Sequence, residues 1–181
     1  MPEKQTIKEA EELLRKRIRD IPDYPKPGIL FKDITPLLKD ASAFKSSIDA
    51  LAAMVSGLDF AYIAGIEARG FIIGAALSYA TGKGFVPVRK KGKLPYKTIS
   101  MDYSLEYGTA TIEMHADSLE KGSRVLVVDD LLATGGTARA CADLIKGSGA
   151  EVAGYAFLIS LKELNGKDRL NEGNVFCLAE Y

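Results

Sequence analysis

The sequence predicts an α/β fold in which a mostly parallel central sheet is flanked by helices. From Phe60 onward, short apolar runs alternate with helical patterns, which is typical of parallel strands joined by helices. The run from Val125 to Val128 has no polar alternation, as expected of a central strand buried on both faces. The length of 181 residues fits one domain, so we expect residues 1–181 to share one core.

The composition excludes several classes of protein. With 47% hydrophobic and 27% charged residues, the chain is neither disordered nor a membrane protein. Lysine plus arginine (24) balances aspartate plus glutamate (24), so no overall field attracts nucleic acid or a membrane. Cys141, Cys177 and the single His115 cannot make a disulfide framework or a four-ligand zinc site. The charged N-terminus and the absence of a long apolar run predict a cytoplasmic protein.

The N-terminal third predicts two helices separated by a turn-rich connection. Residues 6–19 carry apolar side chains at helical spacing, with Thr6 and Glu9 as a capping box. Three prolines and a glycine within residues 22–28 force an irregular connection. Residues 41–56 predict a second helix.

The rest of the chain predicts alternating strands and helices. We expect strands within 60–66, 85–90, 124–129 and 151–160, and helices within 70–82 and 137–149. Residues 90–107 are polar and poorly periodic, and they are longer than an ordinary connection. We therefore expect this segment to be a loop that acts as a lid.

The stretch VLVVDDLLATGGTA, from Val125 to Ala138, has the residue types of a phosphate site. An apolar strand ends in Asp129 and Asp130, and a small-residue loop opens a helix. Backbone N–H groups, hydroxyls and a helix N-terminus suit a terminal phosphate, and the loop residues are Ala133, Thr134, Gly135, Gly136 and Thr137. Two carboxylates beside a phosphate need hydroxyl donors, which a ribose supplies. The loop lacks the lysine of a P-loop and the GxGxxG of a dinucleotide site.

Two further stretches predict anion binding. In AGIEARGF, Arg69 at a strand-to-helix turn suits a pyrophosphate, although a solvated arginine is the plain alternative. Basic residues crowd the following strand and loop. They could form a lid over an anionic substrate, and the alternative is that they are simply surface charges in contact with water. These residues are Arg89, Lys90, Lys91, Lys93 and Lys97.

With these motifs in order, the chain resembles the type I phosphoribosyltransferases, and within them the adenine phosphoribosyltransferase family. VVDDLLATGGTA is similar to the family's phosphoribosyl pyrophosphate (PRPP) motif, here residues 125–138. YPKPGILFKDITPLL resembles its N-terminal hood, about residues 20–38, and AGIEARGF resembles its pyrophosphate loop. RKKGKLP with SLEYG resembles its flexible catalytic loop, about residues 90–107. The resemblance covers roughly residues 18–161.

The resemblance implies a reaction and its residues. The reaction is transfer of the 5-phosphoribosyl group from PRPP to adenine, giving AMP and pyrophosphate in purine salvage. Glu106 is implied as the acid/base that handles the purine proton, with Asp129 and Asp130 on the ribose. The pyrophosphate residues implied are Arg69, Arg89, Lys90 and Lys93, and the adenine residues are Leu30, Phe31 and Lys32. The family also implies Mg²⁺ held by substrate and water, a homodimer, and a cis peptide near Glu67-Ala68.

Two alternatives remain open at this point. A phosphoribosyltransferase for a 6-oxopurine or orotate needs other polar contacts, whereas Ile29, Leu30 and Phe31 offer an apolar slot with backbone groups. A non-catalytic regulator of the same fold that binds PRPP or a nucleotide is expected to carry a nucleic-acid-binding element. The short stretch before the hood and the balanced charge leave no obvious room for one.

Overall fold

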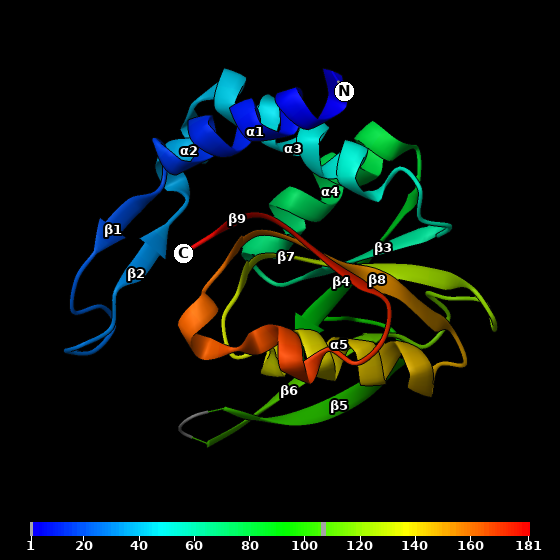
Figure 1. Cartoon of the computed structure of the whole chain (residues 1–181). Coiled ribbons are helices and arrows are strands. Elements are labelled where there is room, and N and C mark those ends of the chain that lie inside the picture. The colour runs from blue at the N-terminus through cyan, green and yellow to red at the C-terminus, as the bar shows by residue number, and fades with distance from the viewer. Residues whose placement is uncertain (1, 106–107) are drawn as a thin grey trace.

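The computed structural model describes residues 2–105 and 108–181. Its main sheet has the strand order β5-β6-β4-β3-β7-β8-β9, and β1 and β2 form a separate hairpin (Figure 1). The strands are β1 (Arg19–Ile21), β2 (Phe31–Asp33), β3 (Tyr62–Ile66), β4 (Gly84–Lys90), β5 (Thr98–Leu105), β6 (Gly108–His115), β7 (Arg124–Leu132), β8 (Glu151–Ser160) and β9 (Asn174–Glu180). The helices are α1 (Pro2–Arg15), α2 (Thr35–Lys39), α3 (Ala41–Val55), α4 (Arg69–Thr81) and α5 (Gly136–Gly147), with the 3₁₀ turns η1 (Lys162–Leu164) and η2 (Gly166–Arg169).

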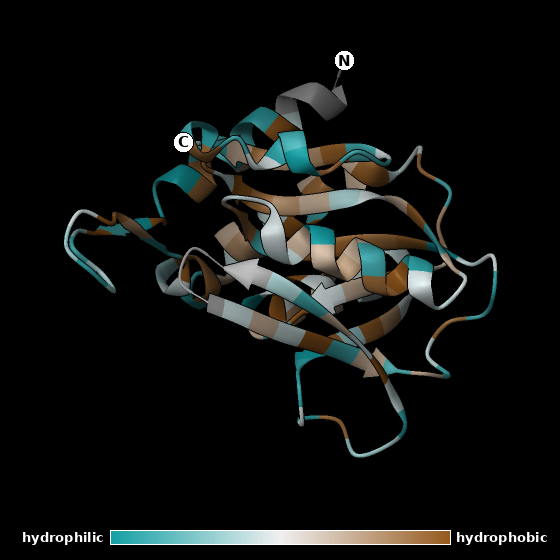
Figure 2. Cartoon of the chain, turned by 90° about the horizontal axis from the view of Figure 1, so that it is seen from below, coloured by the Kyte–Doolittle hydropathy of each residue, from teal (hydrophilic) through white to brown (hydrophobic). Residues whose placement is uncertain are grey.

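The main sheet is parallel except at one edge. Strands β4, β3, β7, β8 and β9 run parallel to one another, whereas β6 and β5 add antiparallel strands beyond β4. Helices α1, α3 and α4 cover one face, and α5 packs on the other, between the parallel strands and β5 (Figures 1 and 2). The predicted α/β class with a mostly parallel sheet and flanking helices is confirmed.

The core lies on both faces of β7, as its apolar run predicts. Residues Val125, Leu126, Val127 and Val128 are fully buried, with alternate side chains in the two apolar clusters above and below the sheet. Each such side chain stabilises the fold by about 1.5–3 kcal/mol through burial. A strand fixed in this way makes a rigid support for the residues at its carboxyl end.

The helix predictions hold except at both ends of the first helix. The second predicted helix is α3, whose first turn is capped by Asp40 through bonds from the amides of Ser42 (3.1 Å) and Ala43 (3.0 Å). The first helix does not extend over residues 6–19, since α1 spans Pro2–Arg15 and Arg19 already belongs to β1. The helix ends where the amide of Arg17 bonds to the carbonyl oxygen of Leu14, three residues back (2.8 Å). Proline is tolerated in a first turn, and the Glu, Lys and Gln that follow favour helix, so the helix begins before the capping pattern. None of the helices in the described residues is long and apolar enough to cross a membrane.

The segment predicted as one long loop is partly a strand. Residues 98–105 form β5, which pairs with β6 from Thr98↔His115 to Leu105↔Gly108. These residues form a strand because the apolar Ile99, Met101 and Tyr103 alternate with polar residues and pack toward the core. The irregular part of this region within the described residues is therefore 91–97.

The turn-rich connection between the first helices is a hairpin, which we call the hood. Its strands β1 and β2 pair antiparallel, and the exposed residues 22–30 join them. Asp23 stabilises the turn by accepting a bond from the amide of Gly28 (2.7 Å). Figure 1 shows the hood reaching out from the body of the molecule beside the carboxyl end of the main sheet.

Candidate active site

Three neighbouring strands deliver polar residues to one edge of the sheet. Strands β4, β3 and β7 are parallel neighbours, so their carboxyl ends meet there. Strand β4 ends in Arg89 and Lys90, β3 leads into Arg69, and β7 carries Asp129 and Asp130 near its end. Ligands of open α/β sheets bind outside this edge. The structure thus brings together residues that are up to about sixty positions apart in the sequence.

The predicted phosphate loop forms a small hollow at the start of α5. The hollow has a volume of about 80 Å³ and is lined by Asp129, Leu131 to Ala138 and Phe157. Gly135 caps the helix with a φ of +79°, a conformation that favours glycine. The free N–H groups of the first turn and the helix dipole favour an anion at this point. The geometry suits the terminal phosphate that the residue types predict.

The phosphate loop is supported from behind by η2. A side-chain Cβ built on Gly166 would lie 2.1 Å from the carbonyl oxygen of Ala133, and one built on Gly135 would lie 2.4 Å from the carbonyl oxygen of Gly166. The two backbones therefore touch with no room for a methyl group. The shape of the loop depends on this contact, which the sequence pattern did not reveal.

The carboxylate pair, with Asp129 half-buried and Asp130 buried, lies beside one arginine. Asp129 accepts a bond from the amide of Asp130 (2.9 Å), and the Nε of Arg69 lies 3.0 Å from Oδ2 of Asp130. Burial raises the pKa of Asp129 well above its ordinary value, and the charge of Asp130 raises it further. Burial also raises the pKa of Asp130, against the opposing charge of Arg69. Such a pair needs hydroxyl or cationic partners when it is ionised.

Arg89 is held by a second acid, Glu67. Its Nη2 donates to Oε1 of Glu67 at 2.9 Å, and its Nη1 donates to the carbonyl oxygen of Lys93 at 2.9 Å. The amide of Lys90 donates to the same carboxylate (3.0 Å). These bonds, led by those from Arg89, hold the pKa of Glu67 below its ordinary value. The Glu67-Ala68 peptide is cis, as the family resemblance implies.

A buried acid that the sequence analysis did not predict anchors residues 91–97, which we call the basic loop. Glu113 of β6 is 4% exposed, and its carboxylate accepts bonds from the amides of Lys93 and Leu94, each at 3.1 Å. Burial acts to raise the pKa of Glu113, but the backbone amides outweigh it and hold the pKa below its ordinary value. The only signal in the sequence was an acid in a strand that alternates polar and apolar residues. The side chains of Lys90 and Lys93 are exposed.

The hood places its three predicted base residues in two environments. Leu30 and Lys32 line a mostly apolar cavity of about 380 Å³, which we call the base slot because the family resemblance implies adenine contacts for these two residues. The slot is also lined by Gly28, Ile29, Leu161, Glu163, Leu164 and Tyr181. The ring of Phe31 instead lies under the guanidinium of Arg69, 5.0 Å from its centre. Arg69 therefore connects the hood to the carboxylate pair.

The predicted acid/base Glu106 lies outside the described residues, as does Tyr107. Among the residues that are described, no three His, Cys, Asp or Glu side chains converge to hold a metal ion. Two neighbouring carboxylates, one of them paired with Arg69, are a poor Mg²⁺ cage by themselves. They fit a cation that is held mainly by substrate oxygens and water.

Comparison with known proteins agrees with this geometry. Residues 37–179 match the family model described as the phosphoribosyl transferase domain. The adenine phosphoribosyltransferase of Pseudothermotoga lettingae is 57% identical over 168 residues, which are 93% of this chain and 99% of the relative. The chain belongs to the adenine phosphoribosyltransferase family. Its predicted membership is confirmed.

Solved structures of the family have the same fold. The adenine phosphoribosyltransferase of Thermoanaerobacter pseudethanolicus superimposes with a TM-score of 0.92 at 51% identity, covering 94% of this chain and 99% of the other. The Saccharomyces cerevisiae enzyme, solved with adenine and an imino-altritol bisphosphate, gives a TM-score of 0.89 at 37% identity. That structure also covers 94% of this chain and 99% of its own. Family membership therefore extends across hood, sheet and phosphate loop.

Proposed function

We propose that this chain transfers the 5-phosphoribosyl group from PRPP to adenine, giving AMP and pyrophosphate in purine salvage. The main support for this proposal is that one edge of the sheet brings together the phosphate loop, the carboxylate pair and Arg69, which contacts the hood. Relatives of more than half identity over nearly the whole chain are named for this activity.

The reaction joins N9 of adenine to C1 of the ribose as the bond from C1 to pyrophosphate breaks. Positive charge grows on the sugar and negative charge on the leaving group, so electrostatic positioning lowers the barrier. The loop from Ala133 to Thr137 holds the 5′-phosphate, since its amides and the α5 terminus favour an anion. Asp129 and Asp130 accept bonds from the ribose hydroxyls, and their charge favours the cationic sugar.

Basic residues at the same edge hold the pyrophosphate. Arg69 and Arg89 each offer a planar guanidinium group that can donate two parallel hydrogen bonds to a phosphate. Lys90 at the exposed end of β4 and Lys93 in the basic loop add positive charge. Glu106 takes the proton that leaves N9, and the segment 90–107 excludes water while the sugar is activated. Mg²⁺, bound through substrate oxygens and water, supplies positive charge that stabilises the leaving group. Removal of Mg²⁺ with EDTA should abolish turnover, and its re-addition should restore it.

The base slot favours adenine over other bases. Its lining by Leu30, Leu161 and Leu164 offers apolar contact, and the exposed backbone of the hood offers main-chain hydrogen bonds. Adenine needs few charged partners, whereas orotate carries a carboxylate. Lys32, the cation of the slot, is already paired with Asp20 at 2.7 Å.

We also propose a homodimer that forms through the outward face of α4. Ile72 and Tyr79 lie seven residues apart on one side of this helix and are 44% and 92% exposed. A helix that is apolar on its solvent side as well as its core side is typical of an interface. Light scattering should show a dimer, and Tyr79→Glu should weaken it. The free Cys141 and Cys177 support a reducing, cytoplasmic setting.

The test of the proposed reaction is a panel of bases. The purified chain is incubated with PRPP, Mg²⁺ and adenine, hypoxanthine, guanine, xanthine or orotate, and pyrophosphate release is measured. We expect release with adenine alone, and its loss in Asp130→Asn. Turnover of another base would overturn the specificity. Tight PRPP binding without release would favour the non-catalytic regulator.

A further inference from the structure

The hood is held from both of its faces by residues far away in the sequence. Phe31 and Lys32 are neighbours in β2, so their side chains point to opposite sides of the strand. Phe31 lies against Arg69 on one side, and on the other the ammonium of Lys32 lies 4.2 Å from the ring centre of Tyr181. Figure 1 shows this end of the chain next to β2.

Lys32 is buried and depends on few partners. It is 8% exposed, and its ammonium pairs with Asp20 at 2.7 Å in the facing strand β1. That pair lies within the hood and does not attach it to the rest of the molecule. The face of an aromatic ring attracts a desolvated cation. The contact with Tyr181 therefore links the hood to the end of the main sheet.

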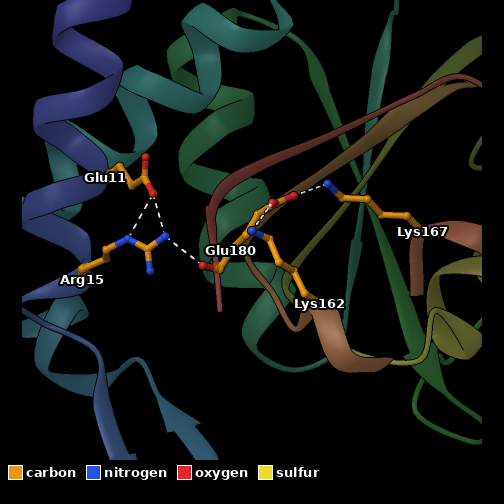
Figure 3. Close-up of polar contacts among 5 residues, drawn as sticks. All are labelled: Glu11, Arg15, Lys162, Lys167 and Glu180. Atoms are coloured by element: carbon orange, nitrogen blue, oxygen red, sulfur yellow. Dashed lines mark hydrogen bonds and ion pairs between the residues drawn. The ribbon is translucent and has the colours of Figure 1, made fainter. Parts of the chain in front are cut away.

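The ring of Tyr181 sits on a fixed backbone. Its amide donates to the carbonyl oxygen of Ser160, and its carbonyl oxygen accepts from the amide of Lys162, both at 2.8 Å. The preceding Glu180 is held as well: its carboxylate pairs with Lys162 (3.1 Å) and with Lys167, and its carbonyl oxygen accepts from Arg15 at 2.8 Å (Figure 3). Tyr181 is thus a rigid platform.

The platform lies at the base slot itself. Tyr181 lines the slot together with Leu30 and Lys32 of the hood. The ammonium of Lys32 lies over the ring of Tyr181, so the ring makes the contact with the hood. Resting on the proposed function, we propose that Tyr181 is a positioning residue for adenine: its ring holds Lys32 and so fixes the hood over the base.

The kinetic test compares two variants of the full chain. Tyr181→Leu keeps an apolar side chain but removes the ring, and we expect the KM for adenine to rise about tenfold, with the KM for PRPP and kcat changed less than twofold. Tyr181→Phe keeps the ring and should restore most of the adenine affinity. An unchanged adenine KM in Tyr181→Leu, an equal rise in both KM values, or a Phe variant as defective as Leu would overturn the proposal.

Two controls separate this effect from general loosening. Lys83 lies over the ring of Phe60 (5.4 Å), next to the start of β4 and away from the hood, so Lys83→Met removes a contact of the same kind without touching the hood or Tyr181. We expect its adenine KM to stay within twofold of the original, and a rise like that of Tyr181→Leu would overturn the route through Lys32. Lys32→Met combined with Tyr181→Leu should be no worse than Lys32→Met alone, whereas additive losses would contradict the proposal.

A second readout does not depend on turnover. Hydrogen exchange of the amides in residues 29–33, measured without substrate, should be faster in Tyr181→Leu and normal in Tyr181→Phe. If the chain turned over no adenine but the exchange changed as expected, the proposed function would fail and the hood contact would stand. Turnover of adenine with unchanged exchange would overturn the hood contact alone.

Discussion

Replacing Gly166 by alanine should damage the phosphate site without touching a ligand. The new Cβ would lie 2.1 Å from the carbonyl oxygen of Ala133 and 3.0 Å from the amide nitrogen of Gly135. A carbon and an oxygen in contact lie about 3.3 Å apart or more, so the loop or η2 must move by about 1 Å. Backbone shifts of this kind cost about 1–3 kcal/mol. For a chain of this size, the melting temperature should fall by about 2–12 °C.

The kinetic effect of the same change should fall on PRPP. A misplacement of about 1 Å in a positioning loop costs up to about 10²-fold in rate. We expect kcat/KM for PRPP to fall by about that factor in initial-rate assays with PRPP varied at saturating adenine, and the KM for adenine to change less. Gly147→Ala is the matched control, because a Cβ there meets nothing within 4 Å, and helix propensity favours alanine. A Gly166→Ala enzyme with unchanged melting temperature and PRPP kinetics would show that the phosphate loop does not depend on its contact with η2.

Three further predictions concern the charged residues of the site. Asp129→Asn should abolish turnover yet raise the melting temperature at pH 8. Burial raises the pKa of Asp129 in the folded state, so its ionisation lowers the stability of the folded chain above that pKa. The rise in melting temperature on substitution should therefore shrink as the pH falls toward the ordinary pKa of 3.8. A rise in melting temperature that does not vary with pH would contradict this. Glu113→Gln should weaken the bonds to the amides of Lys93 and Leu94, so trypsin should cleave the basic loop several-fold faster, and unchanged cleavage would count against the anchor. Arg69→Lys loses the planar fork and should lower kcat/KM for PRPP about 10–100-fold, and a loss below twofold would argue against its role.

Local patterns were enough for four strands of the main sheet, β3, β4, β7 and β8, and for the helices α3, α4 and α5, but they did not predict β5, β6 or β9. The apolar run of β7 and the alternation of strands and helices identify the parallel core, because a strand that is buried on both faces has a continuous apolar sequence. The phosphate loop was equally readable, since its glycines, threonines and acids are consecutive. Strand β5 was missed because its period of two is hidden among the polar residues of 90–107.

Local sequence patterns could not predict the contacts between residues of distant segments. Glu67 with Arg89, Glu113 with the amides of 93 and 94, and Tyr181 with Lys32 each join residues more than eighteen positions apart. Nothing in the residues themselves indicates such pairs, because they depend on strand order and on which side chains are buried. The family resemblance supplied the role of Arg89, but it did not supply the acids that hold this strand and loop.

Product analysis is the sharpest test of the proposed phosphoribosyl transfer. The purified chain is mixed with adenine, PRPP and Mg²⁺, and AMP and pyrophosphate are quantified together over time. We expect AMP and pyrophosphate in equal amounts, and neither product when adenine or PRPP is left out. Pyrophosphate without AMP, or no product from a folded chain that binds PRPP, would contradict it.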